Sequence, residues 1–252
     1  MTTAELDLLQ LREAALAYLA WEQQLSGFGV PAMQVPAVSD LPVQAAPREL
    51  PANDVAAALS RAPAAGGDRR TRLAQLEAEV RTCTSCELAK ARTQTVFARG
   101  NPDSPVVFVG EGPGQEEDRL GSPFVGPAGQ LLDKMITAMG FARDDVYICN
   151  VVKCRPPGNR TPLPQEAGAC APYLLGQLDA IAPRVIVALG RCAAENMGLV
   201  AGGGWRGRWG QFRGIDVMPT YHPAFLLRSP EFKRPVWEDL QKVMARLKAP
   251  GA

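Results

Sequence analysis

The stretch from Pro105 to Gly114 constrains the fold most, because four apolar residues run directly into a turn that holds three glycines. An apolar run with β-branched residues, bounded by proline and glycine, is typical of a strand buried on both faces. Gly110, Gly112 and Gly114 allow a tight turn and leave backbone N–H groups open to an anion or to a planar ligand with polar edges. Glu111 lies inside this turn, so we expect its carboxylate at the mouth of the site.

The same stretch also has a simpler interpretation as a strand-to-helix connection in an α/β domain. Its glycine spacing differs from the dinucleotide-binding fingerprint, and no acidic residue closes a second strand about twenty residues later. A nicotinamide or flavin site is therefore disfavoured.

Beyond this turn the sequence alternates apolar runs with amphipathic segments. The expected strands are residues 106–109, 146–152, 185–189 and 217–221, and the expected helices are about residues 72–81, 128–139, 165–181, 191–197 and 235–247. Alternation of this kind predicts an α/β fold of three αβα layers around a central four-stranded parallel sheet. Because ligands bind beyond the carboxyl ends of such strands, Glu111, Asn150 and His222 should meet at one mouth, beside the Gly190-Arg191 pair.

Composition divides the chain into three parts. In residues 1–28 leucine and alanine recur amid Glu, Arg and Gln, which predicts an amphipathic helix. Proline and alanine dominate residues 29–70, a composition typical of a flexible linker. Residues 71–252 hold the strands and the functional motifs. No run of eighteen apolar residues occurs, and the acidic N-terminus is unlike a secretion signal, so we expect a cytoplasmic protein with no membrane contact.

Charge is uneven along the chain. The net charge is only +1, but residues 205–234 carry Arg and Lys at six positions against one Asp and one Glu. A basic segment of this kind favours a phosphate-rich partner.

Six cysteines lie in residues 71–252, and two of them form the tight pair Cys83-Thr-Ser-Cys86. In a cytoplasmic chain, cysteines serve metal or redox chemistry more often than disulfides. Cys154 and Cys170 are the best candidates to complete a ligand set, because the other two cysteines lie within or beside apolar segments, where free cysteine packs as a small hydrophobe. The residues alone leave open a structural zinc ion, an iron–sulfur cluster and four unrelated core cysteines.

Four motifs, in order along the chain, resemble the family 4 uracil-DNA glycosylases. The motifs are Gly110-Glu-Gly-Pro-Gly-Gln-Glu-Glu-Asp118, Gly121-Ser-Pro-Phe-Val-Gly126, Asn150-Val-Val-Lys-Cys-Arg-Pro-Pro-Gly-Asn-Arg-Thr-Pro162 and Tyr221-His-Pro-Ala-Phe-Leu-Leu-Arg228. The resemblance covers about Leu73 to Leu247 and implies a uracil-DNA glycosylase-like catalytic domain in residues 71–252, acting as a hydrolase in base excision repair of DNA damage. It leaves residues 1–70 unexplained.

The resemblance also bears on the cofactor and on the type of reaction. That family carries a [4Fe–4S] cluster on a C-x-x-C pair and two later cysteines, which correspond to Cys83, Cys86, Cys154 and Cys170. A sister subfamily traps uracil covalently through a histidine in a loop that follows the second strand. This chain has no histidine there and carries Gly112 where the trapping enzymes have Gln, so the resemblance implies turnover.

Two residues at the predicted mouth suit this chemistry. Asn150 can accept a hydrogen bond from uracil N3–H and donate one to O4, whereas cytosine presents the opposite pattern. A site built on such hydrogen bonds can reject the wrong base by roughly 10⁴-fold. His222, the only histidine, would stabilise the anionic leaving base near its O2, although a lone histidine is more often structural.

Three other side chains have paired interpretations. Phe124 would stack on the extruded ring, or would be a core aromatic. Glu117 would block the thymine methyl group, or would be a solvated carboxylate at a helix start. Glu111 would orient water, or its motif would act through the backbone while DNA phosphates stabilise the sugar cation.

The segment from Phe225 to Arg228 has two interpretations as well. Phe225, Leu226 and Leu227 would wedge into the gap that the extruded base leaves, or would belong to the hydrophobic core. Arg228 and its basic neighbours would bind phosphates.

Residues Gln24-Leu-Ser-Gly-Phe28 resemble the pentapeptide by which bacterial repair proteins bind the replication sliding clamp, with Gly27 in place of the usual leucine. A fraying helix end is the simpler interpretation.

The leading function is therefore removal of uracil from single-stranded or mispaired DNA by a nucleoid-associated monomer, which leaves an abasic site. A non-catalytic iron–sulfur protein that captures damaged bases or assists a polymerase, and a zinc-stabilised nucleotide-binding module, stay open as alternatives.

Overall fold

The computed structural model describes residues 69–200 and 204–249 of the chain. The predicted helix over residues 1–28, the pentapeptide Gln24–Phe28 and nearly all of the predicted linker lie outside the described residues. The first described helix, α3, spans Arg69–Thr82 and begins three residues before the expected start. Residues 69 and 70 are therefore helical rather than part of a linker.

The described residues form one mixed sheet of six strands in the order β1-β3-β2-β4-β6-β5. The strands are β1 (Ala98–Gly100), β2 (Val106–Gly110), β3 (Tyr147–Asn150), β4 (Val185–Leu189), β5 (Gly210–Phe212) and β6 (Ile215–Thr220). The four predicted strands pair in parallel as the centre of this sheet, which confirms that part of the expected architecture. Two edge strands, β1 and β5, were not predicted, and each adds three antiparallel residues.

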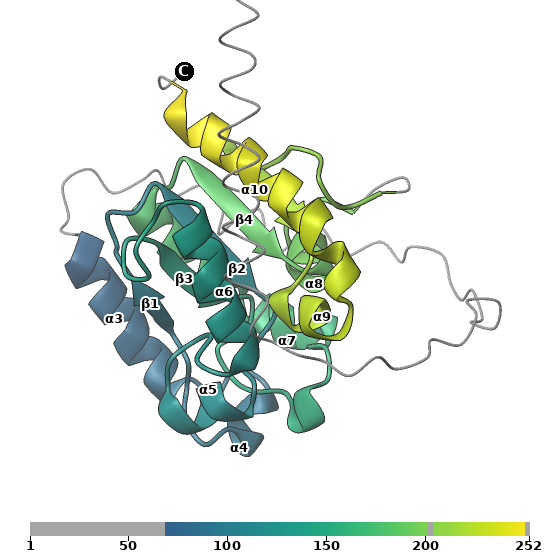
Figure 1. Ribbon diagram of the computed structural model, residues 1–252. Helices are drawn as coiled ribbons and strands as arrows, with labels where there is room; N and C mark the ends of the chain where they lie inside the picture. Colours follow the sequence, from purple (N-terminus) through teal and green to yellow (C-terminus); the bar gives the residue numbers. More distant parts are fainter. Residues whose placement is uncertain (1–68, 201–203, 250–252) are drawn as a thin grey trace, which may run out of the picture.

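Two layers of helices cover the sheet, as expected from the alternation of elements. One face is packed by α6 (Pro127–Ala138), α9 (Pro223–Arg228) and α10 (Lys233–Lys248), and α6 and α10 lie in front of the sheet in Figure 1. The opposite face is packed by α3, α4 (Leu88–Ala91), α7 (Pro164–Ile181) and α8 (Arg191–Asn196). The short α5 (Gln115–Leu120) follows the turn after β2, with 3₁₀ turns at Pro157–Asn159 and Pro230–Phe232 elsewhere.

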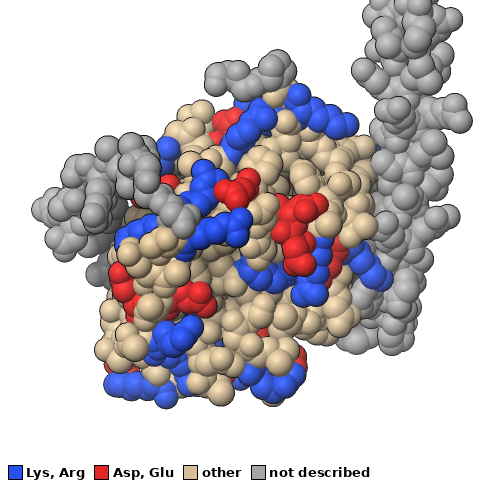
Figure 2. All heavy atoms as spheres, turned by 90° about the vertical axis from the view of Figure 1, so that its left-hand side faces the viewer, with Lys and Arg blue, Asp and Glu red and all other residues tan. Residues whose placement is uncertain are grey.

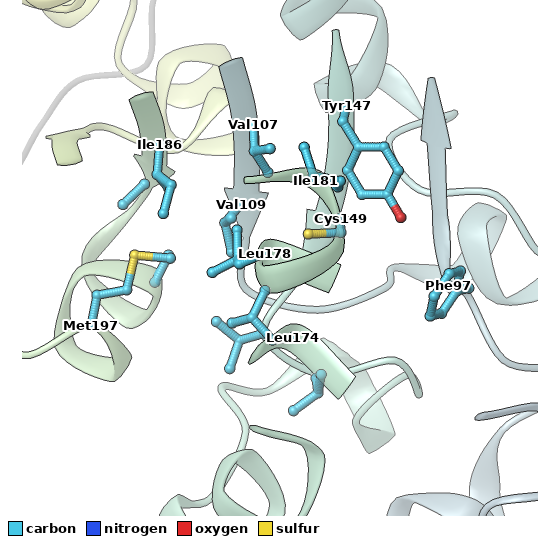
Figure 3. Close-up of a cluster of buried hydrophobic side chains, with 14 of the residues drawn as sticks. Phe97, Val107, Val109, Tyr147, Cys149, Leu174, Leu178, Ile181, Ile186 and Met197 are labelled. Atoms are coloured by element: carbon cyan, nitrogen blue, oxygen red, sulfur yellow. The ribbon is translucent and has the colours of Figure 1, made fainter. Parts of the chain in front are cut away.

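The central strands are buried on both faces, because alternate side chains enter different cores. Val106 and Phe108 of β2 belong to the cluster beneath α6 and α10, while Val107 and Val109 belong to the cluster beneath α7. Figure 3 shows the second cluster, in which the sulfur of Cys149 lies among apolar side chains. Cys149 therefore packs as a small hydrophobe, as expected.

The surface bears on possible partners. On the side of the molecule shown in Figure 2, basic and acidic side chains are intermingled and form no large field of one sign. Within the described ranges, no helix is long and apolar enough to cross a membrane.

We expect Leu131→Ala to lower the free energy of unfolding by about 2–5 kcal/mol, because it removes a fully buried side chain between α6 and the sheet. Leu120→Ala is the matched control, since Leu120 is 51% exposed, and its effect should stay within about 0.5 kcal/mol. Urea denaturation of both variants measures the difference, and equal losses would contradict this packing.

Candidate active site

A pocket of about 460 Å³ opens beyond the carboxyl ends of β2, β3 and β6. It brings together most of the site residues expected from the sequence. Its lining includes Glu111, Gly112, Gly114, Glu117, Phe124, Asn150, His222 and Arg228. The predicted meeting of a carboxylate, an amide and an imidazole at one mouth is thus what the fold produces. Of the neighbouring pair, Gly190 packs beneath His222, whereas Arg191 forms an ion pair with Glu195 along α8.

Gly110 lies just below the pocket, where two functional side chains approach its backbone closely. A Cβ at this position would lie 2.4 Å from Asn150 Oδ1 and 2.6 Å from Phe124 Cζ. Both distances are shorter than side chains tolerate, so only glycine lets the amide and the ring pack here. The space left by Gly110 is therefore needed for the packing of the amide and the ring, in addition to the binding turn expected from the sequence.

Asn150, the last residue of β3, carries a buried amide with an unused acceptor. The residue is 1% exposed, and its Oδ1 has no hydrogen-bond partner in the described part of the protein. A buried polar atom without a partner costs about 1–3 kcal/mol, so such atoms are rare in folded proteins. The unused oxygen suits a ligand N–H group inside the pocket.

His222 lies between β6 and α9 with its ring against Phe124. The ring centroids are 5.5 Å apart and the planes are inclined by 30°. The backbone N–H of Ala224 donates to His222 Nδ1 over 3.1 Å, so Nδ1 is an acceptor and the neutral ring carries its proton on Nε2. Burial lowers the pKa of His222 to about 4, with a further contribution from the charge of Arg228 and an opposing one from Glu117. At neutral pH the imidazole is therefore an uncharged hydrogen-bond donor.

Glu117 holds the turn that presents Phe124. Its Oε1 accepts from the backbone N–H groups of Val125 and Gly126, each over 2.9 Å. Phe124 is buried and has a φ of 56°, in the left-handed region that non-glycine residues rarely adopt. Two hydrogen bonds to the next residues help to hold this conformation. The carboxylate is engaged within the protein rather than solvated at a helix start.

Glu111 lines the pocket directly after β2. Burial raises the pKa of its carboxyl group, a hydrogen bond with Thr161 lowers it, and the charge of Glu195 raises it again. The net result is a pKa above the ordinary value, which suits a group that takes up a proton.

One wall of the pocket was not predicted from the sequence. It consists of Pro156, Asn159, Arg160 and Thr161, in the loop after Cys154. Nη1 and Nη2 of Arg160 donate to the two carboxylate oxygens of Glu166 on α7, over 2.8 and 2.6 Å. This ion pair anchors the wall. The third sequence motif contains these residues, but nothing in their types distinguished a pocket wall from an ordinary loop.

The apolar residues of α9 correct one expectation. Leu226 has no exposed surface and packs in the core where α9 meets α6, so it is a core residue and not a wedge for DNA. Phe225 and Leu227 are half-buried against the same core, and Phe225 also lines the pocket. The sequence could not separate these positions, because a wedge and a helix face present the same apolar pattern.

Several basic side chains of residues 205–234 form ion pairs within the protein. Arg206 pairs with Asp239, Arg213 with Asp179, and Arg234 with Glu238. Arg228 has no ion-pair partner in the described ranges, and it lies at the pocket. Among the basic residues of this segment, Arg228 is thus the one placed to meet an anionic ligand at the site.

A second, smaller cavity lies between α3, α4 and α7. Its walls include Cys83, Cys86, Cys154 and Cys170, all with free thiols. Two donors reach the sulfurs, since Arg92 Nη1 lies 3.2 Å from Cys154 Sγ and the backbone N–H of Lys153 lies 3.3 Å from Cys170 Sγ. No group of three or more candidate ligands among the described residues is arranged to hold a metal ion.

The chemistry of this donor set fits an iron–sulfur cluster. Four thiols line one space, and two of their sulfurs accept hydrogen bonds, as cluster ligands commonly do. Cys149 lies in the core and Cys192 does not line this cavity, so neither belongs to the set.

We expect the imidazole of His222 to titrate with a pKa of about 4, because burial disfavours its charged form. The unfolded chain binds this proton near pH 6.5 and the folded chain does not, so folding stability should fall as pH drops from about 6.5 towards 4. His222 is the only histidine, so a ¹⁵N-detected NMR titration reads it without ambiguity. A folded-state pKa near 6.5, or a proton on Nδ1, would contradict this environment.

Comparison of the sequence with known proteins identifies the family to which a chain with this site belongs. The sequence model described as "Uracil DNA glycosylase superfamily" matches residues 97–241. The type-4 uracil-DNA glycosylase of Thermotoga maritima is 48% identical over 184 residues, which are 68% of this chain and 93% of that protein. The corresponding enzyme of Archaeoglobus fulgidus is 43% identical over 66% of this chain and 88% of its own length. The type-5 enzyme of Pyrobaculum aerophilum is 33% identical over 50% of this chain and 63% of its own length. The chain therefore belongs to the uracil DNA glycosylase superfamily and, within it, to the type-4 uracil-DNA glycosylases.

Proposed function

We propose that this chain hydrolyses the N-glycosidic bond of uracil in single-stranded or mispaired DNA and leaves an abasic site. The observation that carries the proposal is the pairing of an unused, buried acceptor on Asn150 with a neutral imidazole donor on His222 at one pocket. Uracil offers the complementary set, an N3–H donor beside the O2 acceptor. The target base must leave the helix to reach this pocket, which costs least when it is mispaired or single-stranded.

Asn150 selects uracil. Its Oδ1 accepts from N3–H while its amide nitrogen donates to O4. Cytosine has an unprotonated N3 and an amino group in these positions, so it would leave the buried oxygen unpaired. That mismatch is expensive because the amide is enclosed by protein.

His222 stabilises the leaving group. As the glycosidic bond breaks, negative charge builds up on the O2–N1 side of uracil, and the Nε2–H group donates to O2. A neutral imidazole suits this step, because it donates a hydrogen bond to the uracil anion without giving up its proton completely. Phe124 forms the flat wall on which the extruded ring stacks, and Glu117, which holds that wall, lies where a thymine methyl group would meet it.

Glu111 receives the proton of the attacking water. Its raised pKa and its place in the pocket lining suit a general base, with Thr161 fixing the carboxylate. The DNA phosphates next to the extruded nucleotide contribute negative charge that stabilises the sugar cation. Arg228, with Leu227 beside it, contacts the DNA backbone at the pocket rim.

The four cysteines Cys83, Cys86, Cys154 and Cys170 hold a [4Fe–4S] cluster. When bound, the cluster ties α3, α4, the loop after β3 and α7 together, and hydrolysis itself transfers no electron. This loop continues into the pocket wall at Pro156, which links the cysteines to the site.

The enzyme works on DNA as a monomer in the cytoplasm, close to the nucleoid. Residues 24–28 would add a weak contact with the sliding clamp, at the end of a linker that lets the catalytic domain reach nearby DNA. Unchanged retention on immobilised clamp after deletion of residues 1–30 would dispose of this contact.

We expect Cys170→Ala to remove most of the visible absorption of the purified protein, because it takes away one thiolate ligand. Cys149→Ala is the matched control, since that thiol is buried in the core away from the cavity, and its iron and sulfide content should equal that of the wild type. Iron and acid-labile sulfide analysis distinguishes the two. Wild-type protein without iron, or equal losses in both variants, would rule out this ligand set.

We expect Asn150→Asp to reduce uracil release by roughly 10²-fold or more and to narrow the preference for uracil over cytosine, because a carboxylate lacks the donor for O4.

His222→Ala should lower the single-turnover rate by about 10²–10⁴-fold, because it removes the donor to the leaving base. Oligonucleotides with one uracil or one cytosine, treated with alkali after incubation, measure both effects. Near-normal rates in His222→Ala would end the assignment of that residue.

A further inference from the structure

Lys153 is a buried lysine that the reaction described above does not use. It is 1% exposed, and it lies between Asn150 and the cysteine ligand Cys154 in sequence. Lysine is almost never fully buried unless its charge is paired, because removing an ammonium group from water is costly. None of the ion pairs of the described chain includes Lys153.

Its ammonium group makes two short hydrogen bonds. Nζ donates to the backbone carbonyl of Asn150 over 2.6 Å and to Oε1 of Gln177 over 2.6 Å. The first bond fixes the peptide plane at the end of β3, from which the amide of Asn150 projects. Together with the pairing of β3 and β2, Lys153 therefore helps to hold the backbone from which the Asn150 side chain projects.

Gln177 anchors the ammonium group from the opposite side. It is completely buried on α7, and its Nε2 donates to the carbonyl of Phe97 over 3.1 Å and to the hydroxyl of Tyr147 over 3.2 Å. Figure 3 shows Tyr147 and Phe97 beside this core cluster. Every polar atom of Gln177 is thus committed, so the ammonium position is fixed by rigid elements.

The same residue reaches the cysteine cavity. Lys153 lines that cavity, and its backbone N–H donates to Cys170 Sγ over 3.3 Å. Burial raises the pKa of the Cys170 thiol to about 11, and the nearby charge of Lys153 opposes this rise by favouring the thiolate. Thiolates that bind a cluster in this cavity would place negative charge beside Lys153.

We propose that Lys153 is a positioning residue that couples the iron–sulfur cluster to uracil recognition, by holding the Asn150 carbonyl with an ammonium group that the cluster thiolates neutralise. This inference rests on the proposed function, because it concerns the same amide. It assigns the cluster an influence on base binding as well as on the stability of the fold.

The test compares three variants of the full chain purified with its cluster. Lys153→Met keeps the length of the side chain and removes its charge and hydrogen bonds. Gln177→Leu keeps the charge and removes one anchor. Lys90→Met is the matched control, because Lys90 is exposed on α4 close to the cysteines and pairs only with Glu87. Two quantities are measured: the dissociation constant of free uracil by equilibrium dialysis, and the rate at which ferricyanide bleaches the visible absorption.

For Lys153→Met we expect uracil to bind about tenfold more weakly and bleaching to accelerate about tenfold, the range typical of groups that support metal ligands. Gln177→Leu should weaken uracil binding severalfold with wild-type bleaching, and Lys90→Met should change neither quantity more than about twofold. Wild-type uracil affinity in Lys153→Met, or weaker binding with wild-type bleaching in that variant, overturns the coupling.

Two outcomes separate this inference from its premises. If Lys153→Met fails to fold, Gln177→Leu decides, because unchanged uracil affinity in that variant also overturns the coupling. A wild-type chain that neither binds uracil nor releases it from DNA contradicts the proposed function, whereas an active wild type with an unaffected Lys153→Met contradicts only the present inference.

Discussion

The parallel pairing of β2 with β3 is the constraint on which the site depends. In this register Gly110 lies opposite Asn150, so the two strands end side by side and deliver Glu111 and the amide to the same edge. The approach is possible only because Gly110 has no side chain, and the vacated space is filled by Asn150 Oδ1 and the ring of Phe124. A buried glycine on a central strand normally weakens packing, but here it leaves the space in which the Asn150 amide and the Phe124 ring meet.

One continuous segment, residues 150–170, contributes side chains to both the cysteine cavity and the pocket. Residues 150–170 begin with the Asn150 amide at the pocket, continue through Lys153 and Cys154, form the pocket wall, and end at Cys170 on α7. The wall is anchored by Arg160 and Glu166, and the backbone carbonyl of Asn150 is held by Lys153. If the four cysteines hold the proposed cluster, Cys154 and Cys170 would fix both sides of the pocket wall, which would give a hydrolase that moves no electrons a structural reason to keep a cluster.

Much of the fold was predictable from the sequence, because the central strands are unbroken apolar runs and the helices show clear periodicity. The convergence of Glu111, Asn150 and His222 followed from the rule that parallel strands end at one edge. The edge strands β1 and β5 were not predicted, because each has only three partly exposed residues and shows no alternation of apolar and polar positions. The sequence left Leu226 open between wedge and core because its burial depends on how α9 meets α6. Lys153 was not singled out because lysine is normally exposed.

The most direct test of the central claim is a crystal structure of the protein with free uracil. The account predicts the ring in the pocket against Phe124, with N3–H directed at Asn150 Oδ1 and O2 facing His222 Nε2. Uracil bound elsewhere, or bound in the pocket with neither the amide nor the imidazole in hydrogen-bonding contact, would contradict it.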